Sequence, residues 1–296
     1  MAHPLRIGTR GSPLALAQAA MVAEALCRQH GWAAEAVEIV PITTSGDRIQ
    51  DRPLAEVGGK ALWTKELDRC LLEGATDLSV HSMKDVETIR PDTLAIAAML
   101  ARADPRDRLV GADSLAALAA GARIGTSSPR RRAQLLARRP ELAIVTMRGN
   151  VQTRLAKLAR GEADATLLAA AGLDRIGLGD VGVPLDDLLP APAQGAIGIE
   201  VRSDDAQTRN LAAAIDDRET HDCVAAERAF LATLGGDCRS AVAAQARRSG
   251  GTIVLRAEIL LPDGSEVQAG GSEDPAALAR TLLARASPDL RALFGP

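Results

Sequence analysis

The sequence is poor in aromatic residues, since its 296 positions hold two Trp, two Phe and no Tyr. Proteins that bind single-stranded nucleic acid stack the bases on such side chains, so the composition disfavours a nucleic-acid binder. The formal net charge of −3 gives no general attraction to nucleic acid or to an anionic membrane. The chain also lacks the apolar run of about 18 to 20 residues that a membrane-spanning helix needs. We therefore expect neither a nucleic-acid nor a membrane partner.

Cysteine and histidine are also scarce, with four of each. The cysteines form no Cys-x-x-Cys pair, and the chain is too long to need a disulfide framework. The histidines lack the spacing of a metal site, so we expect no metal. Basic and apolar residues near the N-terminus imitate a signal peptide, but the stretch continues into Glu24 and Arg28 without a break. These features favour reduced thiols in a cytoplasmic protein.

Lysine is rare and arginine abundant, with 4 Lys against 31 Arg. Coding bias is one interpretation; the other is that arginine binds carboxylate or phosphate through a bidentate fork that lysine lacks. The segment 121–160 favours the second, because it holds ten basic residues and one acid, Glu141, in an acidic protein. The basic residues are Arg123, Arg130, Arg131, Arg132, Arg138, Arg139, Arg148, Arg154, Lys157 and Arg160. This segment predicts a polyanionic ligand.

The first two thirds of the chain alternate apolar strand patterns with helical ones. We expect strands at 5–9, 36–44, 78–83, 94–100, 123–126 and 143–147, and helices from 13, over 61–72, from 129 and over 151–160. Such alternation predicts parallel βαβ units. A further apolar run at 165–173 and a strand at 195–201 follow.

Two short stretches echo each other. Residues 7–9 and 124–126 both read Ile-Gly-Thr, and each is followed by Ser-Pro, at 12–13 and 128–129. Serine can cap a helix and proline can begin one, so both stretches predict a strand, a turn and a helix start. The echo hints at two similar α/β domains. After residue 219, a helix at 221–234, strands with a turn at 262–264 and a helix at 275–286 predict a small α+β domain.

Arg130 and Arg131 fall in the first turn of a predicted helix. Cations there oppose the helix dipole, while unpaired backbone N–H groups point out of the same end. Together they predict an anion site. Arg148 precedes another strand-to-helix turn, where α/β sheets bind ligands. For these three residues we favour a ligand over a solvated basic face.

Two more candidates carry reactive groups. The stretch His81-Ser82-Met83-Lys84-Asp85 ends an apolar strand, and an acid beside a base there can move protons, although such an Asp is usually a cap. Cys238 follows two glycines in a tight turn, which exposes its thiol. No histidine lies in a protease-like motif, so the thiol suits an attachment point better than a hydrolase nucleophile.

Nearly the whole chain resembles the porphobilinogen deaminase family. The matching stretches are RIGTRGSPLALAQ (6–18), GGKALWTKELD (58–68), DLSVHSMKDV (77–86), DPRDRLV (104–110), IGTSSPRRRAQL (124–135), MRGNVQTRLAKL (147–158), AAAGLDRIGL (169–178), LPAPAQGAIGIEVR (189–202) and ERAFLATLGGDC (227–238). So many ordered motifs make the resemblance specific.

The resemblance implies a transferase of porphyrin and haem biosynthesis, a hydroxymethylbilane synthase. Such an enzyme joins four porphobilinogen molecules head to tail, releases ammonia at each step, and begins on a dipyrromethane cofactor held by a cysteine thioether. The matching cysteine is Cys238, and the matching catalytic carboxylate is Asp85. Each pyrrole carries an acetate and a propionate, so the growing chain is the polyanion that the arginines predict.

Further residues are carried over by motif position. The resemblance implies contacts to the cofactor from Lys84, Thr126, Ser128, Arg130, Arg131 and Gln194. It implies substrate binding by Arg10, Ser12, Lys60, Arg148, Arg154 and Arg175, with Ser12 and Lys60 the weaker matches.

The implied fold has two α/β domains that resemble periplasmic binding proteins, followed by a small α+β domain. We expect domain 1 at 1–99 with 196–216, carrying the catalytic Asp; domain 2 at 100–195, rich in arginine; and domain 3 at 217–296, carrying the cysteine loop. The family also implies a cytoplasmic monomer whose partner is the small molecule porphobilinogen.

The chain departs from the family pattern at four places. Asp237 stands where the family usually has Gly, and an added carboxylate is expected to raise the pKa of the adjacent thiol and slow its attack. Ser240-Ala241 replaces a usual Val-Pro. Trp63 replaces a usual Phe and Pro129 a usual Leu, and both look tolerable.

Two other functions remain open at this point. A two-lobed anion-binding or sensor protein would explain the arginines and the repeat, but not Cys238 or the third domain. A nucleic-acid binder would use the arginines on phosphates, and steep salt dependence of such binding would favour it. Selective retention of porphobilinogen would favour the enzyme.

Overall fold

The computed structural model describes residues 4–44, 63–237 and 240–295. Its contacts divide the chain into two compact units, residues 1–103 with 195–221 and residues 104–194 with 222–296. Within the described ranges, no helix is both long and apolar enough to cross a membrane.

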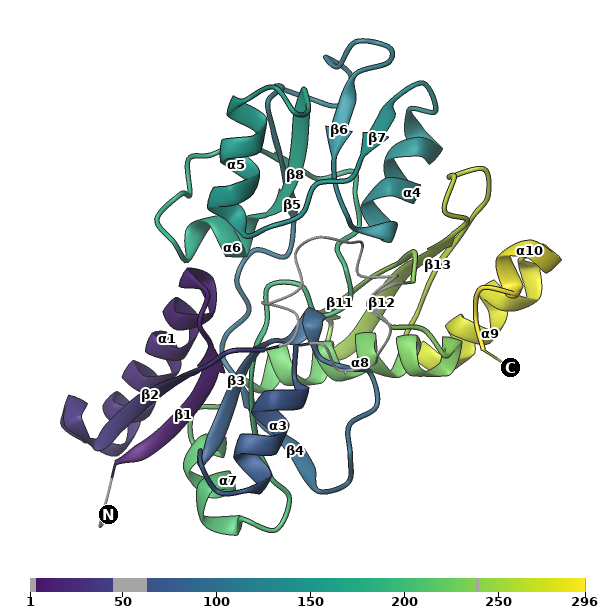
Figure 1. Cartoon of the computed structure of the whole chain (residues 1–296). Helices are drawn as coiled ribbons and strands as arrows, with labels where there is room; N and C mark the ends of the chain where they lie inside the picture. Colours follow the sequence, from purple (N-terminus) through teal and green to yellow (C-terminus); the bar gives the residue numbers. More distant parts are fainter. Residues whose placement is uncertain (1–3, 45–62, 238–239, 296) are drawn as a thin grey trace. The chain divides into compact units, whose positions relative to one another are not determined.

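The first unit is built on a five-stranded sheet (Figure 1). The strand order is β2 (Val37–Ile42), β1 (Leu5–Arg10), β3 (Leu78–Ser82), β10 (Ile197–Arg202) and β4 (Leu94–Met99). Helices α1 (Pro13–His30), α3 (Lys65–Leu72) and α7 (Ala206–Ala213) belong to the same unit, together with the short helices η1 (Ala34–Ala36) and η2 (Met83–Asp85). Ala19, Val22 and Leu26 recur at helical spacing on α1 and pack against Ile7 and Val80 of the sheet.

The second unit repeats this strand order (Figure 1). Its sheet runs β7 (Ala143–Val145), β6 (Arg123–Gly125), β8 (Ala165–Ala169), β5 (Asp107–Val110) and β9 (Val183–Leu185), accompanied by α4 (Pro129–Arg138), α5 (Val151–Ala159) and α6 (Ala170–Asp174). Strand β1 leads into α1 and strand β6 leads into α4, and a serine caps each of these helices. Ser12 Oγ accepts the N–H of Ala15 at 3.3 Å, and Ser128 Oγ accepts that of Arg131 at 3.4 Å. The sequence echo therefore marks equivalent strand-to-helix turns.

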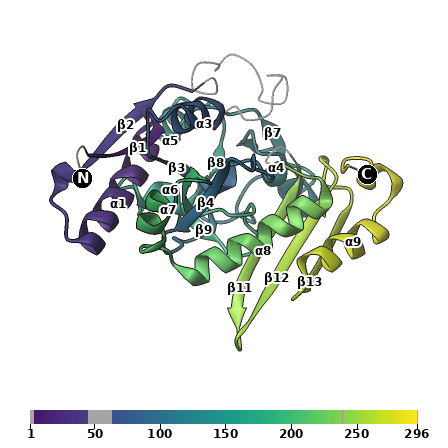
Figure 2. The same cartoon turned by 90° about the horizontal axis from the view of Figure 1, so that it is seen from below.

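The C-terminal part forms a three-stranded antiparallel meander of β11 (Val242–Ser249), β12 (Thr252–Leu260) and β13 (Val267–Ser272). In Figure 2, α8 (Arg218–Leu234) runs along β11 and β12, and α9 (Pro275–Arg285) lies beside β13. Phe230 of α8 and Leu282 of α9 meet Leu255 and Ile259 in one apolar core. A short helix, α10 (Pro288–Arg291), follows. The expected fold class is confirmed: two mixed sheets accompanied by helices, and a small α+β part at the C-terminal end.

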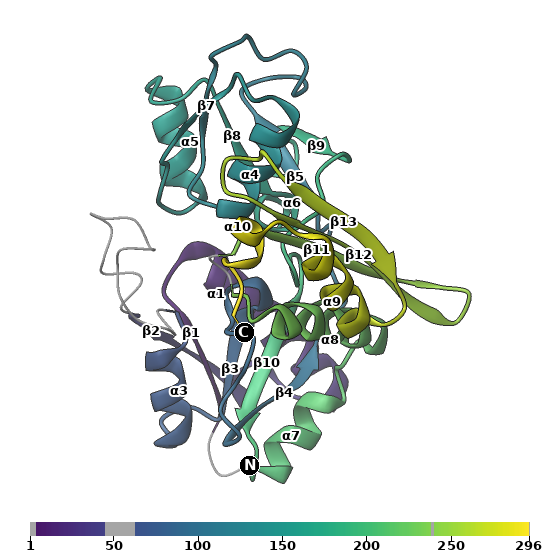
Figure 3. The ribbon, with the colours of Figure 1, turned by 90° about the vertical axis from the view of Figure 1, so that its right-hand side faces the viewer.

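One feature of the sheets differs from the expectation. Strands β1, β2 and β3 are parallel, but β10 runs antiparallel to both β3 and β4 (Figure 3). The reason is connectivity, because β10 arrives from the second unit rather than through a βαβ crossover. In the same way β5 lies antiparallel to β8 and β9.

Candidate active site

A pocket lies in the first unit where β1 and β3 end. Strand β1 ends at Arg10, and β3 leads into η2, whose last residue is Asp85. Ligands of α/β proteins bind at such strand ends. Three of the predicted site residues line this pocket together: Arg10 and Ser12, expected to bind substrate, and Asp85, expected to be catalytic. The other polar and aromatic lining residues are Gln18, Trp63, Thr64, His81 and Ser82.

The wall of the pocket is held by side-chain contacts. The amide Nε2 of Gln18 lies 2.8 Å from Ser82 Oγ, which joins α1 to the end of β3. In the same lining, the guanidinium carbon of Arg10 lies over the Trp63 ring, 3.9 Å from the ring centroid. The sequence pattern alone gives no sign of either contact.

Behind the pocket, His81 contacts the buried carboxylate of Glu200. His81 Nε2 lies 3.0 Å from Glu200 Oε2, and Arg90 Nε lies 2.7 Å from Glu200 Oε1. Burial opposes ionisation of Glu200, but hydrogen bonds and charge from His81 and Arg90 outweigh it and lower the pKa to about 2. Because Glu200 is ionised, Nε2 of His81 must carry the hydrogen and donate it.

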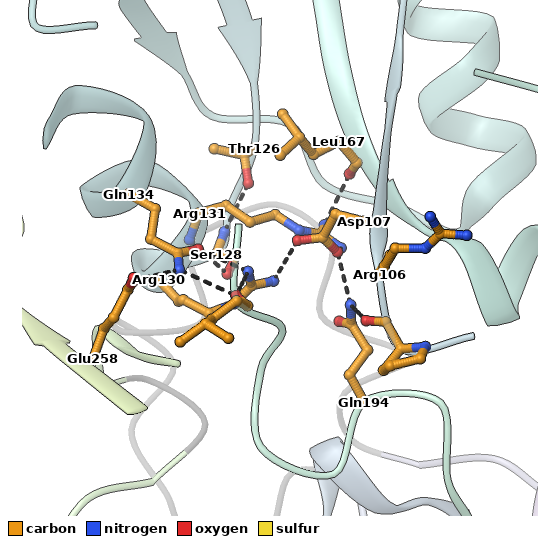
Figure 4. A network of polar contacts seen from close by, with 12 residues as sticks. Arg106, Asp107, Thr126, Ser128, Arg130, Arg131, Gln134, Leu167, Gln194 and Glu258 are labelled. Atoms are coloured by element: carbon orange, nitrogen blue, oxygen red, sulfur yellow. Dashed lines mark hydrogen bonds and ion pairs between the residues drawn. The ribbon is translucent and has the colours of Figure 1, made fainter. Parts of the chain in front are cut away.

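The second unit gathers three of the predicted cofactor-binding residues around one carboxylate (Figure 4). Asp107 at the start of β5 has no exposed surface. Its oxygens accept from Arg130 Nη2 at 2.8 Å, Arg131 Nη2 at 2.7 Å and Gln194 Nε2 at 2.8 Å. Burial raises the pKa of Asp107, but the two guanidinium groups outweigh it and hold the pKa far below its usual range. Two cations and one anion leave a net positive charge in the interior.

Helix α4 is fixed at both sides of these arginines. Thr126 Oγ1 accepts the N–H of Ser128 at 3.1 Å, which shapes the turn before the helix. One turn further on, Gln134 accepts from Arg130 Nη1 at 2.9 Å and donates to Glu258 of β12 at 2.8 Å. The arginine side chains are therefore oriented before any ligand arrives.

The buried arginines retain unused donors. Nε of Arg130, Nε of Arg131 and Nη1 of Arg148 are buried and have no hydrogen-bonding partner among the described residues. Buried polar hydrogens without partners are costly and point to an absent acceptor. With the net positive charge, these donors fit the carboxylates of an acidic ligand. A dipyrromethane that carries acetate and propionate groups is such a ligand.

The remaining predicted residues lie elsewhere. Arg154 on α5 donates from Nε to the carbonyl of Gly149 at 2.9 Å. Arg175 is the C-cap residue that follows α6, and burial lowers its pKa to about 10. Lys84 is part of η2 but is not among the residues that line the pocket. Lys60 and Cys238 lie outside the described residues, so their predicted roles stay predictions.

Sequence reasoning missed Asp107, Gln134 and Glu200. Each is a polar residue with no exposed surface, inside an element that reads as apolar or basic. The sequence offers one signal for such residues, which is a single acid within an element expected to be buried. A buried charge needs a partner, so such an acid indicates a polar contact. That signal cannot name the partner when it lies in another element.

Comparison with known proteins agrees with this geometry. Residues 5–210 match the family described as "Porphobilinogen deaminase, dipyromethane cofactor binding domain", and residues 221–286 match "Porphobilinogen deaminase, C-terminal domain". The porphobilinogen deaminase of Sphingopyxis alaskensis is 59% identical over 99% of this chain and 97% of its own. That of Paracoccus denitrificans is 54% identical over 93% and 90%.

Solved structures of periplasmic binding domains are also similar. The VFT2 domain of Bordetella pertussis BvgS aligns with a TM-score of 0.42 and 15% identity, over 77% of this chain and 91% of that one. A periplasmic substrate-binding protein of a Coxiella burnetii ABC transporter aligns with a TM-score of 0.43 and 18% identity, over 76% and 96%. By its matched domains and its relatives, the chain belongs to the porphobilinogen deaminase family of transferases, and it carries that family's dipyrromethane cofactor-binding domain.

Proposed function

We propose that this chain is a hydroxymethylbilane synthase, which joins four porphobilinogen molecules head to tail on a covalently held dipyrromethane and releases ammonia at each step. The observation that carries the proposal is the pair of buried arginines, Arg130 and Arg131. They share the single carboxylate of Asp107, keep a net positive charge and retain unpaired Nε donors. A polycarboxylate ligand satisfies all three features.

The cofactor, when bound, supplies the pyrrole end to which substrate units are added. In this proposal Cys238 holds it by a thioether, and Lys84, Thr126, Ser128 and Gln194 join the two arginines around it. One contact supports this assignment: Ala241, three positions after Cys238 in the sequence, packs against Ala133 of α4, one turn from the arginines.

The proposed catalytic residue is Asp85. When the aminomethyl group of porphobilinogen loses ammonia, the C–N electron pair leaves with nitrogen and the methylene carbon becomes electron-poor. A fixed carboxylate beside this carbon stabilises the positive charge and lowers the barrier. Arg10, which lines the same pocket, binds a substrate carboxylate in the proposal, and Ser12, Lys60, Arg148, Arg154 and Arg175 complete the substrate-binding set.

The first test is the intact mass of the purified protein beside a Cys238→Ser variant. The proposal expects an adduct of two linked porphobilinogen units in the wild type and none in the variant. An unmodified wild type that added porphobilinogen also fails to modify would overturn it and favour an anion-binding protein of the same fold.

A second test concerns Asp85. We expect Asp85→Asn and Asp85→Ala to fold normally and to lose nearly all turnover, because the developing cation loses its counter-charge. Porphobilinogen consumption and circular dichroism check the two statements. Asp92→Asn, which alters an exposed acid seven residues on, is the matched control. Normal turnover in either Asp85 variant removes this carboxylate from the mechanism.

We further propose a cytoplasmic monomer with porphobilinogen as its small-molecule partner. The net charge of −3 and the shortage of aromatic residues support the absence of a nucleic-acid or membrane partner. Size-exclusion chromatography with light scattering tests the monomer.

A further inference from the structure

Trp63 and Arg10 form one unit of the pocket wall. Trp63 lies just before the N-terminus of α3, and Arg10 is the last residue of β1. The guanidinium carbon lies 3.9 Å from the indole centroid, well inside the reach of a cation–π contact. Both side chains line the pocket that also contains Asp85.

We propose that Trp63 is a positioning residue that holds the guanidinium of Arg10 in the plane needed to bind a substrate carboxylate. The inference rests on the proposed function, because porphobilinogen supplies the carboxylate. Trp63 itself need not touch the substrate. It acts through Arg10.

The chemistry of the guanidinium group supports this role. Its N–H donors all lie in the plane of the group and point outward from its edges, while its faces carry none. An aromatic ring that covers a face therefore restricts the plane of the group without occupying its donor edges. A carboxylate needs two of those donors in parallel, so the plane decides whether a bidentate pair forms.

The choice of tryptophan strengthens the effect. Indole is the best cation–π partner among the aromatic side chains, and phenylalanine is weaker. An arginine without such support loses more rotamer freedom when it binds. We therefore expect Trp63 to act on substrate binding, and so on KM, with little effect on kcat.

The kinetic test compares Trp63→Leu and Trp63→Phe with the wild type, after intact mass has shown equal cofactor content. Trp63→Leu is expected to raise KM for porphobilinogen roughly three- to tenfold, the range of a partly exposed cation–π contact, with kcat within about twofold. Trp63→Phe is expected to lie between the two. An unchanged KM in Trp63→Leu, or a loss confined to kcat, would overturn the proposal.

A double-mutant cycle separates positioning from simple packing. In an Arg10→Gln background, Trp63→Leu is expected to change KM no further, because the group it positions is gone. A multiplicative effect in that background would show that Trp63 acts independently of Arg10, and the proposal would fail.

The chain offers an optical readout besides turnover, because it has only two tryptophans. Trp32 stacks on His30 at 4.7 Å, outside the pocket, so Trp32→Phe leaves Trp63 as the one indole emitter and basal activity unchanged. Arg10→Gln is then expected to shift the Trp63 emission without ligand, and porphobilinogen is expected to shift it when Arg10 is present. If neither Arg10→Gln nor the addition of porphobilinogen shifts the Trp63 emission, the inference is contradicted.

These outcomes also separate the two proposals. Normal turnover with uncoupled Trp63 and Arg10 overturns the positioning role alone. A wild type that neither binds nor consumes porphobilinogen overturns the proposed function and this inference with it.

Discussion

At the scale of single residues, Asp107 organises the second unit. It has no exposed surface and accepts from two arginines and one glutamine. Because Arg130 and Arg131 are adjacent in the chain and almost fully buried, their mutual repulsion is tolerable only with an anion between them. The carboxylate of Asp107 therefore allows both arginines to be buried. Because it neutralises only one of the two positive charges, one remains to attract an anionic ligand.

We expect Asp107→Asn to destabilise the protein by about 3 to 5 kcal/mol, because two buried cations lose their counter-charge. Asp104→Asn is the matched control, since Asp104 pairs with Arg106 at 2.8 Å where both side chains are partly exposed. That pair is worth about 0 to 1 kcal/mol. Urea unfolding measures both. Equal midpoints in the two variants would mean that Asp107 is not the electrostatic centre of this network.

The sequence could place the arginines but not their partner. Ser128-Pro129 fixed the start of α4, so Arg130 and Arg131 were correctly expected in its first turn. Asp107 lies 23 positions before Arg130, on a strand that periodicity did not reveal because only four residues form it. A contact between elements depends on the packing of the whole sheet, which local patterns do not encode.

At the scale of elements, the hairpin between β12 and β13 docks on the arginine helix. Gly264 in its turn has φ +76°, and a Cβ there would lie 2.3 Å from the backbone N of Ala137 on α4. Leu260 and Ala241 pack on Ala133 of the same helix. The C-terminal meander therefore supports the helix that carries Arg130 and Arg131. For this reason the second compact unit includes the meander.

Gly264→Ala is expected to lower the melting temperature more than Gly250→Ala. Both glycines have positive φ, but a Cβ at Gly250 would meet open space. Gly250→Ala should cost about 1 to 2 kcal/mol, the penalty of that backbone conformation alone. Gly264→Ala adds a backbone clash and should cost several kcal/mol. Calorimetry measures the melting temperatures of the two variants. Equal decreases would show that Gly264 is not in close contact with the backbone of α4.

Elements with clear periodicity were predictable, while their directions were not. The helices at 13–30, 129–138 and 275–285 and the strands that precede the first two of them, β1 and β6, follow from capping residues and apolar spacing. Strands β10 and β5 run antiparallel because the chain enters each of them from the other unit, and no local sequence pattern indicates such a crossing. The division into three domains stays a prediction.

At the scale of the whole molecule, stability depends on a few interior carboxylates. Three carboxylates have no exposed surface: Glu200 in the first unit, and Asp107 and Glu227 in the second. Glu227 accepts the backbone N–H groups of Ala193 and Ala246 at 2.6 and 2.7 Å. Protonation of Asp107 or Glu200, whose pKa values lie below their usual range, removes the charge on which their partners depend, so acid should unfold the protein in a way that surface groups do not explain.

The pKa of Glu200 defines the pH range in which this loss of stability is expected. Its pKa is about 2 in the folded protein against an ordinary 4.5, so its stabilisation is complete above about pH 4.5 and is lost as the pH falls toward 2. The loss is about 3 kcal/mol. Unfolding free energies between pH 5 and 2 should fall less steeply in Glu200→Gln than in wild type or in Glu273→Gln, an exposed control. Parallel slopes would contradict the assignment.

The place of β10 in the first sheet also sets an order of assembly on the ribosome. Strands β3 and β4 leave the exit tunnel early, yet the strand that joins them, β10, ends only at Arg202. Until then the edges of β3 and β4 that pair with β10 have no partner strand and could pair wrongly. The five strands of the second sheet all lie between residues 107 and 185 and can pair before β10 has emerged. The sheet of the second unit should thus form first, and the sheet of the first unit should be completed only when β10 has been synthesised.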